Sequence, residues 1–148
     1  MNVLSHPSIK KNKIKLVLYW LSALYYSIKQ GEQMKQLEQL TKLDNNIKVY
    51  VPSTTDVDKK VDTSKQIDNT LTLLSSKFGG STSTKGTGTW VSETSGLVKE
   101  EVTICESYCT GSALKNSLTE VIEYCEDLKK ELSQEAISLE VNNKLYFI

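Results

Sequence analysis

The chain has 148 residues, 39 % of them apolar, and its eighteen lysines balance eighteen acidic residues to give a net charge of zero. This length suits one domain with an extension, and the apolar fraction excludes a disordered chain. Arginine, the usual bidentate reader of guanine and phosphate, is absent, which together with the zero net charge argues against DNA as a partner.

Residues 1–45 are predicted to form an N-terminal extension. Its apolar run from Leu16 to Ile28 indicates a helix and follows four lysines. Thirteen residues fall short of the roughly 20 that a spanning helix needs. A secretory signal peptide would be followed by a small-x-small cleavage site, and none occurs here. One alternative is therefore a helix lying on a membrane surface.

A second alternative is that translation begins at Met34. The preceding stretch "QGEQM" back-translates to a purine-rich ribosome-binding sequence before an ATG. Residues 1–33 would then be translated upstream DNA, and the only histidine, His6, would be lost with them. A peptide spanning Tyr25 to Lys35 in protein from the native source would contradict this hypothesis.

Because the apolar run is short and the net charge is zero, we expect no membrane partner.

Residues 46–148 are predicted to form a compact α+β domain. The β-branched and aromatic residues from Ile47 to Val51 predict a strand closed by Pro52. The stretch "TTDVDKKVDTS" after it is predicted to be a polar loop.

A helix is predicted after this loop. Its apolar stripe recurs with helical spacing, and Gly79 ends it. Either Asp62 or Thr63 can cap its start, and Thr63 with Gln66 fits a capping box. The stripe consists of Ile67, Leu71, Leu74 and Phe78.

Two strands are predicted next, a glycine-rich one over residues 81–93 and another over residues 97–109. In the second strand, alternate residues share one face, which we expect to face the core, although Glu100 and Glu106 fall on it too. The apolar members of this face are Val98, Val102, Ile104 and Tyr108.

A long helix is predicted from Gly111, with an apolar seam that steps by four and three residues. Such a seam fits either a helix packed across a sheet or a dimer contact. The seam residues are Leu114, Leu118, Val121, Cys125, Leu128 and Leu132.

The C-terminal stretch is predicted to be a hairpin, with Ile137, Leu139 and Val141 pointing inward and a left-handed turn at Asn142-Asn143. The predicted order is β-α-β-β-α-β-β, a mainly antiparallel sheet with two helices on one face and an N-terminal helical extension.

Catalytic side chains are scarce in residues 46–148. The segment lacks histidine, so it has no His-based triad. Its three cysteines are odd in number and lack a CxxC spacing, which favours free thiols over a zinc site. The acidic pairs Asp56/Asp58, Glu100/Glu101 and Glu126/Asp127 fit solvated patches. We therefore expect a binding protein that is not an enzyme, with no metal and no cofactor.

The stretch "FGGSTSTKGTGTW" is the candidate binding site. It lacks the Walker and GxGxxG spacings, but its glycines, hydroxyls and lysine suit an anion, and its aromatic ends suit stacking on a base. With two neighbours on the next strand, the candidate ligand-binding residues are Phe78, Gly79, Gly80, Ser81, Thr82, Lys85, Trp90, Lys99 and Tyr108.

The strings "YVPST", "FGGSTSTKGTGTW", "GLVKEE" and "QEAISLEVNNKLYFI" resemble small proteins of phages and prophages. The resemblance covers residues 47–148 and is closest to the Thoeris anti-defence 1 family of nucleotide-signal sponges. It implies an α+β homo-oligomer in the host cytoplasm that sequesters a cyclic ADP-ribose isomer or a cyclic oligonucleotide, as in Thoeris or CBASS defence, without cleaving it. That family holds phosphate largely through arginines, so here Lys77, Lys85 and Lys99 would have to substitute.

The alternative hypothesis is a phage inhibitor that blocks a host protein by direct contact. The helical seam and the apolar C-terminus would then be its contact surfaces.

Overall fold

The computed structural model of the chain describes residues 7–55, 59–92 and 96–148, with side chains from Lys15 onward and without that of Ser92. His6 and the predicted acidic pair Asp56/Asp58 lie outside the described residues. The chain divides into two units, residues 1–42 and residues 43–148. The first holds one long helix, α1 (Pro7–Glu38).

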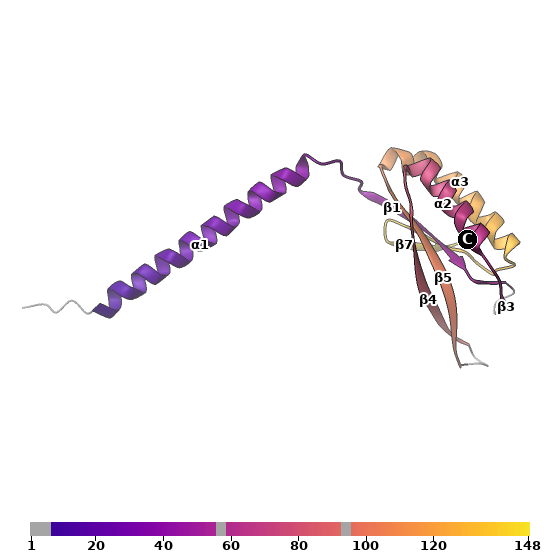
Figure 1. Cartoon of the computed structure of the whole chain (residues 1–148), viewed down its shortest axis with the longest axis horizontal. Helices are drawn as coiled ribbons and strands as arrows, with labels where there is room; N and C mark the ends of the chain where they lie inside the picture. Colours follow the sequence, from indigo (N-terminus) through magenta and orange to yellow (C-terminus); the bar gives the residue numbers. More distant parts are fainter. Residues whose placement is uncertain (1–6, 56–58, 93–95) are drawn as a thin grey trace, which may run out of the picture. The chain divides into compact units, whose positions relative to one another are not determined.

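The second unit is built on a five-stranded antiparallel sheet with the strand order β4-β5-β1-β6-β7. Helices α2 and α3 both lie on one side of this sheet (Figure 1). The predicted α+β class and order are thereby confirmed, with one addition: the segment predicted as a polar loop contains the two-stranded sheet β2-β3. The elements are β1 (Asn45–Pro52), β2 (Thr54–Thr55), β3 (Lys59–Lys60), α2 (Ser64–Phe78), β4 (Thr82–Ser92), β5 (Gly96–Cys109), α3 (Gly111–Glu131), β6 (Ser138–Val141) and β7 (Lys144–Phe147).

Helix α2 begins and ends where the sequence predicts. Gly79 ends it in the left-handed region at φ 91°, and its N–H donates to the Ser75 carbonyl at 2.9 Å. The Asp62 carboxylate caps the start, accepting from the Ser64 hydroxyl at 2.6 Å and the Ser64 N–H at 3.0 Å. These two bonds lower the pKa of Asp62. The capping box of Thr63 and Gln66 is wrong, because the Thr63 side chain makes no capping bond.

The apolar seam of α3 is part of the core of the same protomer. Leu114, Val121, Cys125, Leu128 and Leu132 are all buried in one cluster with residues of β1, β5, β6 and α2. These five seam residues therefore pack across the sheet. Thr110 caps the helix, its hydroxyl accepting from the Ala113 N–H at 3.2 Å.

The core face of β5 is the opposite of the one predicted. Cys105, Ser107 and Cys109 are buried under the helices. Their side chains are small, so the helices can lie close to this strand. The side chains predicted for the core alternate with these on the other face, where Tyr108 is 55 % exposed. They are Val98, Val102, Ile104 and Tyr108.

The C-terminal hairpin is confirmed. Ile137 and Leu139 are buried, and Asn142 and Asn143 have φ of 51° and 61°. The chain end is tied down because Ile148 exchanges two backbone hydrogen bonds with Ile137, at 3.0 and 3.2 Å.

Candidate functional site

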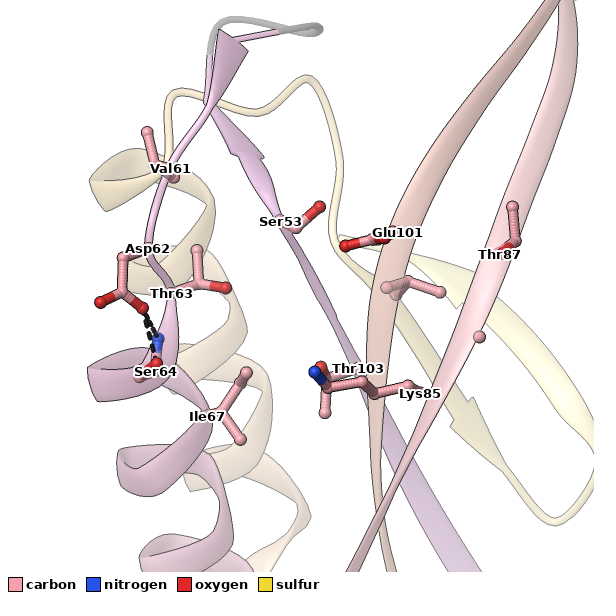
Figure 2. A pocket seen from close by; sticks show the side chains of 12 residues that line it. Ser53, Val61, Asp62, Thr63, Ser64, Ile67, Lys85, Thr87, Glu101 and Thr103 are labelled. Carbon is pink, nitrogen blue, oxygen red and sulfur yellow. Dashed lines mark hydrogen bonds between the residues drawn. The ribbon is translucent and has the colours of Figure 1, made fainter.

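A cavity of about 430 Å³ lies on the helix side of the sheet, next to the start of α2 (Figure 2). The helix begins only at Ser64, so the outer part of the β4-β5 ribbon has no α2 residue over it and its side chains face this space. The lining residues are Ser53, Val61, Asp62, Thr63, Ser64, Ile67, Lys85, Gly86, Thr87, Glu101, Val102 and Thr103.

Four side chains from alternate positions of two strands form the floor of this cavity. Lys85 lies opposite Thr103 in the antiparallel register, and Thr87 lies opposite Glu101. Side chains at alternate positions share one face of a sheet. Figure 2 shows the Lys85 side chain running from β4 toward Thr103 on β5. An ammonium group, a carboxylate and two hydroxyls are therefore gathered on one polar surface.

The end of β1 contributes the Ser53 hydroxyl. The Ser53 N–H donates to the Glu101 carbonyl at 3.0 Å, and its carbonyl accepts from the Val61 N–H at 3.0 Å, so the backbone here is fixed on both sides. The hydroxyl oxygen is buried and has no hydrogen-bond partner among the described residues. A buried polar atom without a partner is costly, so this hydroxyl is an unsatisfied group at the wall of the cavity, covered in the structure as it stands.

A second cavity, of about 290 Å³, adjoins the first and shares Ser53, Thr87 and Glu101 with it. Trp90 lines this cavity and is 39 % exposed, so its indole face is accessible. The Glu100 carboxylate also lines it and accepts a hydrogen bond from the Thr54 hydroxyl. Glu100 is thus engaged in structure, whereas Glu101 is exposed toward both cavities.

The two cavities share lining residues but face opposite sides of the β4-β5 ribbon, because Trp90 and Val98 alternate with Thr87 and Glu101 along the two strands. The volume of the first cavity falls in the range typical of small-molecule sites, and the second cavity is just below it. Lys85 suits an anionic group, Glu101 suits a cationic one, and the Thr and Ser hydroxyls suit a sugar. Trp90 offers a stacking surface for a base.

The structure divides the predicted ligand-binding residues among three cavities. Lys85 lies in the first, and Trp90 and Lys99 lie in the second. The others line a third cavity of about 330 Å³ at the C-terminal end of α2. These are Phe78, Gly79, Gly80, Ser81, Thr82 and Tyr108.

Some residues predicted to bind an anion already make hydrogen bonds or ion pairs within the fold. The Ser81 hydroxyl donates to the Leu71 carbonyl at 3.0 Å and lies 2.7 Å from the Ser75 hydroxyl. The Gly80 carbonyl accepts from the Ser107 hydroxyl. Lys77, one of the three lysines expected to replace arginine, is paired with Glu120 at 2.6 Å. Whether any of the predicted residues binds a ligand stays a prediction.

Sequence reasoning missed several polar residues of the first cavity. It assigned Glu101 to a solvated acidic patch, although the residue lines both adjoining cavities. The available signal was the alternation of polar residues along β4 and β5 at Lys85, Thr87, Glu101 and Thr103. The other missed residues are Ser53, Thr63 and Ser64.

The three cysteines are free and buried, although the predicted core face placed Cys105 and Cys109 away from the core. Burial raises the pKa of Cys105 to about 11 and that of Cys125 to about 12. Neither thiol is a nucleophile near neutral pH, because the thiolate is the reactive form. Within the described ranges, no group of three or more His, Cys, Asp or Glu residues is placed to hold a metal ion.

Comparison with solved structures gives two matches. A structure titled "phage SAM lyase in complex with S-methyl-5'-thioadenosine" aligns over 74 % of this chain and 92 % of its own, with 15 % identity and a TM-score of 0.55. A structure titled "phage SAM lyase in apo state" aligns over 74 % and 95 %, with 14 % identity and a TM-score of 0.54. No protein-family model and no curated protein matches the chain. At these identities the likeness shows a shared fold.

This likeness corrects one expectation from the sequence, that the chain is not an enzyme. The fold it shares is that of a lyase. The expectation rested on the scarcity of catalytic side chains, which matters less for a reaction that needs no general acid or base. Neither structure belongs to the Thoeris anti-defence 1 family, so that resemblance stays a prediction.

Proposed function

We propose that residues 43–148 bind S-adenosylmethionine and cleave it, releasing S-methyl-5'-thioadenosine. The observation that carries the proposal is the likeness in fold over 92 % of a phage lyase that was captured with S-methyl-5'-thioadenosine. The polar cavity beside α2 supplies an independent reason, because it gathers the groups that this substrate needs.

The charges of the substrate suit the first cavity. S-adenosylmethionine carries a sulfonium, an ammonium and a carboxylate on one short chain. Glu101 is the lining carboxylate beside Ser53, and it serves the cationic groups, while Lys85 serves the carboxylate. Thr87 and Thr103 serve the ribose hydroxyls. Adenine extends past Thr87 and Glu101 around the edge of the ribbon to stack on Trp90 in the second cavity.

The cleavage we propose needs no general base. The bond between the sulfonium sulfur and the γ-carbon breaks, and sulfur keeps the electron pair to become a neutral thioether. The carboxylate of the same substrate forms a new bond to that carbon, closing a five-membered lactone. No proton is transferred, so a site without histidine can perform the reaction by holding the chain in a folded conformation. Glu101 and Lys85 are placed to do this.

We also propose that a second copy of the chain completes the site. Lys85, Thr87 and Glu101 are all exposed, and an enzyme that excludes water from its substrate needs more cover than this. The homo-oligomer predicted from the sequence would supply it. Light scattering of the purified chain tests this part, and a monomer at all concentrations would contradict it.

The decisive experiment incubates the purified chain with S-adenosylmethionine and measures S-methyl-5'-thioadenosine and homoserine lactone by chromatography. We expect both products in equal amounts, and a loss of about 100-fold or more in rate for Glu101→Gln, as for removal of one preorganised electrostatic contact. Glu123→Gln, an exposed position on α3, is the matched control and should retain the full rate. Products no faster than in buffer would overturn the proposal.

The sequestration of a cyclic nucleotide, and the alternative of a directly bound host protein, both stay predictions. A thermal-shift panel of cyclic ADP-ribose isomers and cyclic di- and trinucleotides tests the first. A shift with these nucleotides, combined with none for S-adenosylmethionine or S-methyl-5'-thioadenosine, would favour sequestration over the lyase.

A further inference from the structure

The apolar run of α1 is uncovered on every side within its own unit. Each large apolar side chain from Leu16 to Ile28 is between 55 and 72 % exposed. These side chains point in all directions around the helix, because the run is almost uninterrupted by polar residues. A continuous apolar surface of this kind marks a contact with a partner or a membrane.

The charge of this segment differs from that of the remaining chain. Residues 1–31 contain five of the eighteen lysines and none of the eighteen acidic residues. The segment therefore carries a charge of about +5 and residues 32–148 a charge of about −5, a contrast that the net charge of zero conceals. Lysines next to an exposed apolar helix are the pattern that binds anionic lipid surfaces.

The spacing of the flanking lysines fits a helix that lies in the membrane interface. Lys15 and Lys29 border the apolar run and are about 21 Å apart along the helix at 1.5 Å per residue. A bilayer core is about 30 Å thick, so the run between these lysines is shorter than the core, whereas both amines can reach one surface together. Within the described residues, no helix is long and apolar enough to cross a membrane.

The aromatic residues of the run also suit the interface. Tyr19, Trp20, Tyr25 and Tyr26 combine an apolar ring with a polar group, and such residues concentrate where lipid headgroups meet acyl chains. The Lys29 amine lies 5.5 Å from the centre of the Tyr25 ring, which places a cation and an aromatic ring side by side at the end of the run.

A second copy of the helix covers this surface less well. A coiled-coil seam through Leu18, Leu21, Tyr25 and Ile28 would meet Glu32 at its next position, so it extends over about two heptads. It would also leave Tyr19 and Trp20, on the opposite side of the helix, in water. In a lipid surface, the side with Leu18 and Leu21 can contact the acyl chains, while Tyr19 and Trp20 on the other side can lie among the headgroups.

We propose that α1 is a peripheral membrane anchor that binds anionic lipid bilayers in the plane of the interface. The expectation of no membrane partner rested on the zero net charge and the short apolar run. The zero net charge is no obstacle, because the lysines are concentrated next to the apolar run. The short run is no obstacle either, because a helix that lies in the plane of the interface does not need to span the bilayer. The proposal is independent of the reaction proposed for residues 43–148.

The test is co-sedimentation of the full chain with vesicles of phosphatidylcholine alone or phosphatidylcholine with phosphatidylserine. We expect binding to the anionic vesicles that weakens with added salt. Leu18→Glu with Leu21→Glu should abolish it. Replacing the four lysines before the run with glutamine should weaken it by roughly fivefold for each lysine near the surface. The matched control replaces four exposed lysines of the other unit, Lys59, Lys65, Lys115 and Lys144.

The outcomes separate the membrane from a second copy. The α1 variants should show the same thermal unfolding of residues 43–148 as the wild type, because the altered residues are outside that unit. Wild-type chain that stays in the supernatant with anionic vesicles would overturn the proposal. So would a lipid-free oligomer that the Leu18→Glu and Leu21→Glu changes dissociate while vesicle binding persists.

Discussion

The two halves of the β4-β5 ribbon use the same kinds of residue for different purposes. In the packed half, near the end of α2, the Ser81 and Ser107 hydroxyls bond to carbonyls of Leu71 and Gly80, so they hold the sheet to the helix and its end. In the free half, beyond the start of α2, the neighbouring Ser53 hydroxyl has no partner in the described structure, and Glu101 is exposed. The hydroxyls near the end of α2 are therefore bonded within the fold, whereas Glu101, beyond the start of α2, is left exposed.

The largest effect we expect is on stability, from a change under the packed half. Leu74 is fully buried in α2 against the sheet. Leu74→Ala should lower the free energy of unfolding by about 2–5 kcal/mol, because it removes buried methyl groups and leaves a cavity. Denaturant unfolding measures this, and a loss below about 1 kcal/mol would show that this half is not tightly packed.

Alkaline pH should weaken the same packed half. The unfolded thiols lose their protons near pH 9, whereas burial keeps Cys105 protonated to about pH 11 and Cys125 to about pH 12. Their contribution to stability is fully present below pH 9 and falls above it, by about 1.4 kcal/mol per pH unit for each thiol. Unfolding midpoints between pH 8 and pH 10.5 measure the slope. A Cys105→Ala, Cys125→Ala double variant with an unchanged slope would contradict this origin.

In the free half, Trp90→Ala should weaken ligand binding with little effect on stability. The indole is 39 % exposed and lines the second cavity. Calorimetry with S-methyl-5'-thioadenosine should show a loss of about 1–3 kcal/mol in binding free energy, the usual value for one stacked base. Phe147→Ala is the control, since Phe147 is an exposed aromatic on β7. Equal losses for both variants would remove Trp90 from the site.

The smallest effect should come from Ser81→Ala, which tests whether the packed half of the ribbon takes part in ligand binding. This change removes one partly buried hydrogen bond to the Leu71 carbonyl and should lower the free energy of unfolding by about 1 kcal/mol. Binding of S-methyl-5'-thioadenosine should not change. If binding weakens while stability is preserved, Ser81 belongs to a ligand site, as the sequence alone predicted.

Most of the fold could be predicted from the sequence because local signals were strong. The stripe of α2, the seam of α3 and the asparagine turn each depend on spacing within one segment. The core face of β5 could not be predicted this way. Period-two alternation yields two faces, and only the arrival of the helices decided that Cys105 and Cys109 are buried and Tyr108 is exposed.

The site was harder to predict than the fold. The glycines and hydroxyls near Phe78 predicted a ligand site because they are close together in the sequence. In the structure, however, the Ser81 hydroxyl is used for packing. Ser53, Lys85 and Glu101 lie on three different strands or strand ends and meet only through pairing across the sheet. A single sequence does not reveal which residues of different strands pair with each other.

The burial of every cysteine in the chain makes it a convenient background for site-specific fluorescence. None of the three thiols is at the surface, so maleimide dyes should react slowly with the folded wild type. A single cysteine placed at an exposed position, such as Ser22→Cys on α1, would then be the one fast-reacting site. A dye there would report its surroundings without interference from native thiols.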